Sequence, residues 1–327
     1  MSSSIATSSS TSNTSLQLPR MARIWDSAGM LLVLAALFLY CSLFVNNFLS
    51  VANLRGLALS VSTIGMISCT MMFCLAAGDF DLSVGSVVAF AGVLGATVMN
   101  ATGSVALGVA AALAAGTLIG FLNGIFVARV GVNALITTLA SMQIVRGLGF
   151  IASDGRAVGI RTDGFFALGN TAWLGVPVPV WLTIGCFIVF GVLLNLTIFG
   201  RNALAIGGNK EAAHLAGVPV KRVKIMIFAL QGLVAAFAGL VLAARMTSGQ
   251  PNTSLGLELE VISACVLGGV SLSGGVARIS AVVAGVLIMG LVQNAMNLLN
   301  IPPFYQYVAR GLILLCAVML DRIKSRR

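Results

Sequence analysis

The segment GRNALAIGGNKEAAHLAG, residues 200–217, is a polar loop between two long apolar segments. The run Gly207-Gly208-Asn209 breaks the chain before Lys210 to Ala216, which can form about two helical turns, and Gly217 follows in a helix C-cap position. Glu211 lies at the N-terminal end of this short helix, where the helix dipole stabilises a carboxylate by roughly 0.3 to 1 kcal/mol. The loop is therefore either a solvated hairpin with a capping charge or a surface that another protein binds.

The composition places the chain in a bilayer. Of its 327 residues, 58% are hydrophobic and 9% charged, whereas soluble domains carry about 25% charged residues, and the mean hydropathy is +1.04. Apolar runs predict an all-α polytopic membrane protein with about ten transmembrane helices, over residues 28–46, 56–77, 83–100, 104–127, 132–153, 179–199, 224–244, 258–271, 279–298 and 304–320. The run at 258–271 is short, so about eight or nine complete crossings with one re-entrant piece are the alternative.

Basic residues orient these spans. With the N-terminus inside, the outer segments hold only Arg55, Arg156, Arg161 and Arg245, and most other basic residues fall inside with the loop at 200–217. Lys and Arg are retained on the cytoplasmic side, so both termini are predicted to be cytoplasmic. The net charge of +10 is thus a topology signal, and no nucleic-acid partner is expected.

The chain divides into a tail and one membrane domain. Residues 1–18 are mostly Ser and Thr without an apolar core, which is typical of a disordered cytoplasmic tail rather than a signal peptide. Residues 19–327 form the transmembrane domain, with residues 200–223 as its main cytoplasmic loop.

Weak internal similarities indicate a duplication within that domain. Val145-Arg146-Gly147-Leu148 echoes Ala309-Arg310-Gly311-Leu312 at a spacing of 309 − 145 = 164 residues, which predicts an inverted repeat of five spans per half. A competing echo pairs residues 78–83 with 268–273 at a spacing of 268 − 78 = 190. The first is favoured because an arginine within a span is rare.

Small residues recur every four positions along the fourth span. Such a stripe lets another helix approach closely. Packing within one subunit is favoured over a dimer seam. The stripe comprises Gly108, Ala112, Gly116, Gly120 and Gly124.

Enzyme chemistry is not expected. A phosphate-binding loop needs G-x-x-x-x-G-K-[ST], and none of the four lysines stands in that pattern, so ATP hydrolysis is assigned to a separate partner chain. The single histidine, His214, has no second metal ligand near it, and the six cysteines lie within apolar spans, where they are expected to be buried small hydrophobic residues. Neither a metal nor a cofactor is expected.

Several motifs run from about Trp25 to Arg322. They include LAAGDFDLSVGS at 75–86, ALITTL at 134–139, GRN with AIGGN at 200–209, EAA with Gly217 at 211–217, RMTSGQP at 245–251 and VLGG at 266–269. Together they resemble the motifs of the permease subunits of bacterial ABC importers for pentoses and hexoses. The family usually has a second glycine where this chain has Asp79, so a left-handed turn there is in doubt.

The resemblance implies a subunit of the bacterial inner membrane that translocates a monosaccharide, with L-arabinose as the expected sugar. It implies a homodimer of permeases in membrane lipid, an ABC ATPase subunit and a periplasmic sugar-binding protein. It also assigns ATPase coupling to Asn209, Glu211, Ala212, Ala213 and Gly217. The alternative is an ion-coupled secondary sugar transporter, for which Asp79 and Asp81 are the candidate carboxylates, although both are expected at the interface. Asp81 is also expected to cap the third span.

Polar residues inside spans are costly and usually face a cavity or a partner helix. Two stripes are candidates for the translocation path, and interhelical packing is an equal alternative for both. Arg146 and Arg310 are expected to pair with Glu260 or Asp154 as structural ion pairs, with a gate as the second choice. The stripes are Asn133, Thr137 and Ser141 on the fifth span, and Gln293, Asn297 and Asn300 on the ninth.

Overall fold

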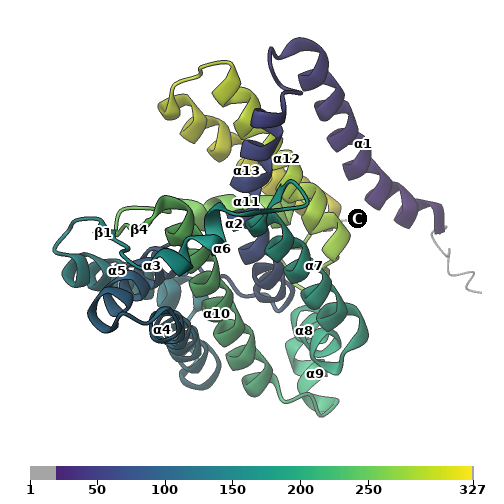
Figure 1. Ribbon diagram of the computed structural model, residues 1–327. Helices are drawn as coiled ribbons and strands as arrows, with labels where there is room; N and C mark the ends of the chain where they lie inside the picture. Colours follow the sequence, from purple (N-terminus) through teal and green to yellow (C-terminus); the bar gives the residue numbers. More distant parts are fainter. Residues whose placement is uncertain (1–19, 326–327) are drawn as a thin grey trace, which may run out of the picture.

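The computed structural model describes residues 20–325, so the predicted tail over residues 1–18 lies outside the described residues. Nearly all of the described chain is helical (Figure 1). The longer helices are α1 (Arg20–Phe44), α2 (Val51–Ala76), α3 (Val84–Thr102), α4 (Val105–Ile125), α5 (Ala134–Ser153), α7 (Val178–Leu196), α8 (Ile198–Gly208), α10 (Val220–Met246), α11 (Leu257–Leu267), α12 (Ile279–Leu298) and α13 (Pro303–Ser325).

Short elements join these helices. They are the π-helical turn η1 (Phe126–Val130), the 3₁₀ turn η2 (Asp163–Phe165), α6 (Ala167–Asn170), α9 (Lys210–Leu215) and the strands β1 (Val158–Gly159), β2 (Ala172–Trp173), β3 (Val176–Pro177) and β4 (Ser248–Gly249). The strands form two small antiparallel pairs, β1 with β4 and β2 with β3.

Each predicted span coincides with a helix, but the helices are not equivalent. Seven are long and apolar enough to cross a membrane, and the apolar parts of α1 and α13 are shorter. α11 has only 11 residues, or about 16 Å of rise, against about 30 Å of hydrocarbon. The predicted span at 258–271 is therefore not a complete crossing, as its short apolar run indicated.

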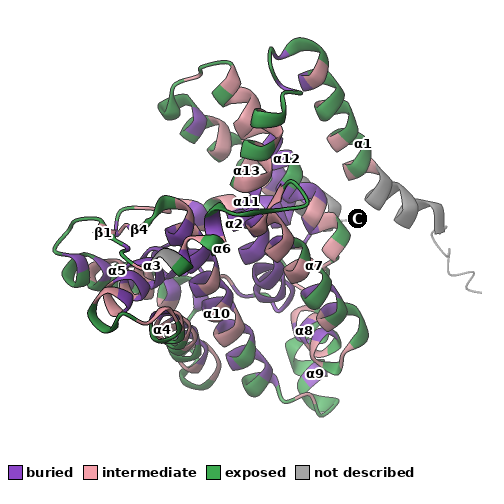
Figure 2. Cartoon of the chain, viewed as in Figure 1, coloured by how far each residue is buried: buried purple, intermediate pink, exposed green. Residues whose placement is uncertain are grey.

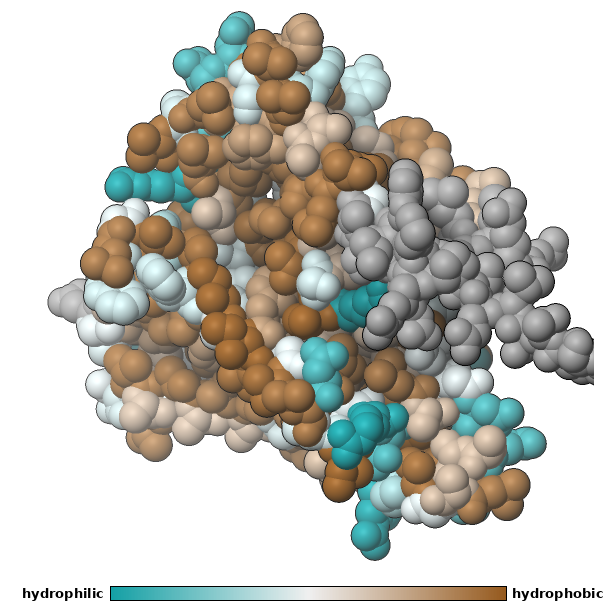
Figure 3. Space-filling view, turned by 90° about the vertical axis from the view of Figure 1, so that its right-hand side faces the viewer, coloured by the Kyte–Doolittle hydropathy of each residue, from teal (hydrophilic) through white to brown (hydrophobic). Residues whose placement is uncertain are grey.

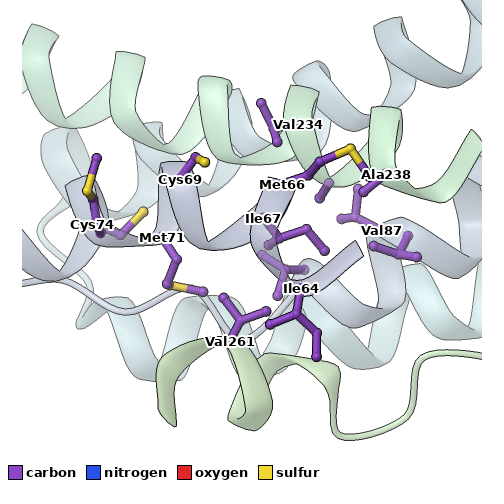
Figure 4. Packing of buried hydrophobic residues seen from close by; sticks show 14 of the residues in the cluster. Ile64, Met66, Ile67, Cys69, Met71, Cys74, Val87, Val234, Ala238 and Val261 are labelled. Carbon is purple, nitrogen blue, oxygen red and sulfur yellow. The ribbon is translucent and has the colours of Figure 1, made fainter. Parts of the chain in front are cut away.

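α2 is the centre of the molecule. Its residues from Val61 to Ala76 are all buried, and Figure 2 shows this burial concentrated in α2, α3 and α10, while the outer helices are more exposed. In Figure 4, Met66 and Ile67 of α2 lie among Val87 of α3 and Val234 of α10. An apolar helix buried along most of its length is fixed by packing on every side.

The small-residue stripe of α4 is a packing face within the subunit, as predicted. Its residues are buried, and a Cβ on Gly120 would lie 2.1 Å from the Phe228 carbonyl oxygen of α10. Gly116 meets Gly232 in the same way, with 2.6 Å between its added Cβ and the Gly232 oxygen. The two backbones touch because neither glycine has a side chain.

The contacts fit the inverted repeat with the 164-residue spacing. α2 and α10 pack side by side. The end of α2 meets the start of α10 through the Asp79–Lys224 pair, and Arg245 at the end of α10 donates to the Leu59 carbonyl early in α2, so the two helices are antiparallel. In the first half the third helix, α3, packs on α4 and α5. In the second half the third helix, α11, packs on α12 and α13 in the same way. Arg245, predicted in an outer segment, is instead partly buried against α2 because its guanidinium finds that carbonyl.

Candidate functional site

Two features of the fold are candidates for function: the coupling segment, defined as residues 198–219, and the re-entrant loop, defined as residues 247–256. The coupling segment comprises α8, Asn209, α9 and the turn that leads to α10. In Figure 1 it lies at the lower end of the molecule, and Figure 3 shows a mostly hydrophobic side face on which hydrophilic residues gather near the same end. This polarity is that of a membrane-facing surface with a solvated end.

Asn209 organises the centre of the coupling segment. It ends α8 and begins α9 in an extended conformation, and its side-chain oxygen accepts a hydrogen bond from the Ala212 amide at 2.9 Å. The break predicted over residues 207–209 lies at Asn209 alone, because α8 continues through Gly207 and Gly208. An asparagine at an N-cap satisfies an amide that the helix itself leaves free.

Gly217 ends α9 as predicted. Its φ is +84°, its amide donates to the His214 carbonyl at 3.0 Å, and the Val218 amide donates to the Ala213 carbonyl at 3.0 Å. This is a glycine C-cap of the kind that only a left-handed residue allows.

The coupling segment is anchored on one face and exposed on the other. Ala213 is buried, whereas Asn209, Glu211, Ala212 and Gly217 are exposed. Next to them is a depression of about 660 Å³. Its lining includes Ala128, Lys210, Glu211, His214, Gly217, Pro219, Lys221, Arg222 and Lys224.

A buried ion pair joins the start of α10, just after the coupling segment, to the connection between α2 and α3. Lys224 Nζ lies 2.8 Å from an Asp79 carboxylate oxygen, and both side chains are 10% exposed. Burial raises the pKa of the Asp79 carboxyl above its ordinary value, although the charge and hydrogen bond of Lys224 pull that pKa down. The left-handed turn in this connection belongs to Gly78, with φ +77°, and not to Asp79. Asp79, at the position where the family usually has a glycine, is therefore not strained in its backbone, and its carboxylate forms the ion pair with Lys224.

Asp81 accepts hydrogen bonds from the amide and hydroxyl of Ser83, at 2.9 and 2.6 Å. Burial raises the pKa of the Asp81 carboxyl to about 6 against these hydrogen bonds. Ser83 in turn accepts from the side chain of Asn123 on α4. Asp81 thus acts just before α3, through Ser83, rather than as its N-cap. Asp79 and Asp81 are both buried in the protein, because α4 and α10 cover this connection.

The re-entrant loop lies inside the membrane domain rather than outside it. Gly249 packs on Gly92 in the middle of α3, where an added Cβ would come within 2.4 Å of the Gly92 oxygen, and a Cβ on Gly85 would meet the Ser254 oxygen at 2.6 Å. The loop therefore follows α3 from its middle toward its start. Non-helical backbone at membrane depth is tolerated where it is buried in protein or lines a wet cavity.

Arg146 and Arg310 approach this region from two sides. Arg310 of α13 forms an ion pair with Glu260 in the first turn of α11 and lies over the Tyr307 ring, so this predicted pair is present. Arg146 of α5 donates to the carbonyl oxygens of Pro251 and Thr253, at 2.8 and 2.7 Å. Its expected ion pair with Glu260 or Asp154 is wrong, because the loop carbonyls lie nearer to its guanidinium than those carboxylates.

The stripe predicted on the fifth span is divided in the structure. Asn133 is the N-cap of α5 and accepts from the Leu135 amide, and Thr137 donates to the Asn133 carbonyl. Thr137 and Ser141 line a mainly apolar groove of about 450 Å³ between α4 and α5.

The stripe on the ninth span faces α13. Gln293 lines a small pocket shared with Arg310, Asn297 accepts a hydrogen bond from Gln306, and Asn300 has φ +53° in the turn between α12 and α13. Leu291 of the same helix is buried under α1. Its position on the helix could not show this, because α1 covers it only in the tertiary fold.

Sequence reasoning missed the re-entrant loop and the Asp79–Lys224 pair. The run TSGQPNTSLG at 247–256 was available as a signal, since nine of its ten residues are turn-forming or polar and they precede an unusually short apolar run. Glu258 and Glu260 lie in the first turn of α11, at the edge of the predicted span over 258–271 and beside the re-entrant loop.

Comparisons with known proteins identify the family. The family model described as "Branched-chain amino acid transport system / permease component" matches residues 53–318. The chain is 62% identical to the L-arabinose transport system permease protein of Escherichia coli K12, over 93% of each chain. It is 56% identical to the L-arabinose ABC transporter permease protein of Azospirillum brasilense, over 92% of this chain and 89% of that one. With the ribose import permease protein of Bacillus subtilis it shares 39% over 92% and 94%. No solved structure matches significantly. The chain belongs to the branched-chain amino acid transport system permease family of multi-pass membrane proteins.

Proposed function

We propose that this chain is the membrane-spanning subunit of an ATP-driven importer for L-arabinose. The observation that carries this proposal is identity: 62% and 56% with two L-arabinose permeases, against 39% with a ribose permease, over nearly the whole chain in each case. The two relatives with the higher identity are both named as L-arabinose permeases, and the relative with the lower identity is named as a ribose permease.

The importer needs partners that supply energy and sugar. We assign the exposed side of the coupling segment, with Asn209, Glu211, Ala212 and Gly217 around the anchored Ala213, to docking of an ABC ATPase. Two permease copies form the path in the inner membrane, with both termini in the cytoplasm, and a periplasmic binding protein delivers the sugar. The anchored and exposed faces of α9 support the docking role, because a docking helix needs both.

The path itself is assigned to the face where the re-entrant loop meets α5, next to the first turn of α11 with its Glu260–Arg310 pair. Asn252 is exposed there, and Thr253 and Ser254 are partly exposed. Amides and hydroxyls suit a neutral sugar, which must be held by hydrogen bonds weak enough to release it. Gln293 of α12 borders this region through its pocket with Arg310, whereas Asn297 contacts Gln306 of α13 and Asn300 lies in the turn between α12 and α13. Thr137 and Ser141 lie in the α4–α5 groove, and Asn133 caps α5.

The test is uptake of radiolabelled sugar in cells that lack their own arabinose permease and express this chain with its ATPase and binding protein. L-Arabinose should enter, unlabelled D-ribose should compete weakly, and uptake should stop when ATP is depleted but not when an ionophore collapses the ion gradient. Uptake that the ionophore abolishes while ATP is maintained would establish the ion-coupled alternative. Uptake of ribose in preference to arabinose would refute the sugar assignment.

A further inference from the structure

The last turn of α8 touches two other parts of the chain through bare backbone. A Cβ on Gly207 would lie 1.8 Å from the carbonyl oxygen of Ala76, the last residue of α2, and 2.5 Å from the Gly275 amide nitrogen. The Gly275 amide donates to that same Ala76 oxygen at 2.9 Å. Three segments far apart in sequence thus meet at one peptide group, with no side chain between them.

The third of these segments connects α11 to α12. Gly274 and Gly275 have φ of +86° and +79°, and a Cβ on Gly274 would lie 2.7 Å from the Gly207 oxygen. Left-handed backbone at consecutive positions is adopted readily by glycine alone. The connection is therefore shaped to lie against α8.

Beyond the connection, α11 and α12 pack as one unit. A Cβ on Gly285 of α12 would lie 1.9 Å from the Ala264 oxygen of α11, and one on Gly268 would lie 2.3 Å from the Ala281 oxygen. A displacement at the connection therefore moves α11 as a body, because close-packed backbone leaves no room to absorb it. The far end of α11 carries Glu260 in contact with Arg310, next to the re-entrant loop.

We propose that the junction of Gly207, Ala76 and Gly275 transmits movement of the coupling segment to α11, which makes Gly207 a positioning residue of the transport cycle. This inference rests on the proposed function, because it takes the coupling segment to be the surface that an ATPase moves. α11 rises about 16 Å along its length, and its first turn lies beside the re-entrant loop, so a rigid shift of the connection at its other end reaches that loop. The Asp79–Lys224 pair ties the start of α10, just after the coupling segment, to the connection that follows the same α2.

The chain offers a matched pair of variants for the test. Gly207→Ala places a methyl group against the Ala76 oxygen, whereas a Cβ on the adjacent Gly208 meets nothing within 4 Å. Neither glycine has a positive φ, so both variants have the same backbone preference. With each variant purified together with the ATPase, we expect Gly207→Ala to retain the ATPase but to lose at least tenfold in sugar uptake. Its ATP hydrolysis should no longer rise when the sugar-loaded binding protein is added, while Gly208→Ala behaves as the wild type.

A second measurement needs no change at the junction, and it applies even where Gly207→Ala does not fold. Leu255, in the re-entrant loop just before α11, is 60% exposed. A single cysteine there, with the native cysteines replaced, should react with a hydrophilic thiol reagent at rates that differ severalfold between the nucleotide-free complex and one holding a non-hydrolysable ATP analogue. In the Gly207→Ala background that difference should disappear.

The outcomes separate the two proposals. If the wild-type chain neither retains the ATPase nor imports sugar, the proposed function is wrong. If the wild type does both, and Gly207→Ala imports sugar as Gly208→Ala does, the junction is packing only. An identical thiol reaction rate at Leu255 in both nucleotide states of the wild type would also overturn the inference.

Discussion

Replacement of Lys224 by methionine tests the buried ion pair at the start of α10, just after the coupling segment. Methionine keeps the length of the side chain and removes its charge, which leaves Asp79 buried at 10% side-chain exposure without its partner. Loss of one member of a buried pair costs about 3 to 5 kcal/mol. Since 1 kcal/mol shifts the unfolding midpoint of a domain by roughly 2 to 4 °C, we expect a drop on the order of 10 °C.

The loss should depend on pH. The folded-state pKa of the Asp79 carboxyl is raised, because burial outweighs the attraction of Lys224. A raised carboxyl pKa gives a stabilising contribution that is present at low pH and is lost as the pH rises through the folded-state pKa. Without Lys224, that pKa rises further, so the stability difference between variant and wild type should widen as the pH rises above the ordinary carboxyl range.

The assay is thermal unfolding of detergent-solubilised protein, followed by tryptophan fluorescence, at several pH values. Lys221→Met is the matched control, since Lys221 lies in the same first turn of α10 but is exposed. Equal midpoints for the two variants at every pH would refute the argument that the pair stabilises this end of the fold.

Three other substitutions test separate features. Gly217→Val places a β-branched residue at φ +84°, which costs roughly 1 to 2 kcal/mol, so sugar uptake should fall while membrane insertion persists; wild-type uptake would contradict this role for the C-cap. Glu260→Gln leaves the Arg310 guanidinium without its carboxylate and should lower the unfolding midpoint. Adding Arg310→Met to Glu260→Gln should recover part of the loss, and a double variant less stable than the single one would contradict this role for the pair. A single cysteine at Gln293 should react with a hydrophilic thiol reagent faster than one at the exposed Leu287 of the same helix, and equal rates in all nucleotide states would show that the α12 stripe is packing.

The helices were predictable because a bilayer sets their length. Each apolar run of about 20 residues corresponds to a helix, and Gly217 was recognised as a cap because only a left-handed residue fits there. The spacing of the two VRGL-like segments gave the repeat, since the arginines that mark it are rare within spans.

The tertiary pairings were not predictable from the sequence. Asp79 and Lys224 are 145 residues apart, and no local sequence pattern in either segment indicates that the two residues pair. The composition of the re-entrant loop does not reveal its depth, which is set by long-range contacts such as that of Gly249 with Gly92. From the sequence, Arg146 was expected to pair with a carboxylate, because an arginine is most readily matched to an opposite charge. In the structure its guanidinium donates instead to backbone carbonyl oxygens of the loop, which have no partner in regular secondary structure and accept hydrogen bonds equally well.

The position of α2 explains why the junction at Gly207 would direct movement toward α11. α2 is buried from Val61 to Ala76, so it cannot shift without repacking the core, and interiors at this density resist such changes. The connection with Gly274 and Gly275 has no side chains at that point and leads into α11 and α12, which pack closely on each other as one unit. A force applied to α8 therefore meets a fixed surface at Ala76 and a movable one at Gly275, and the movable one leads to the re-entrant loop.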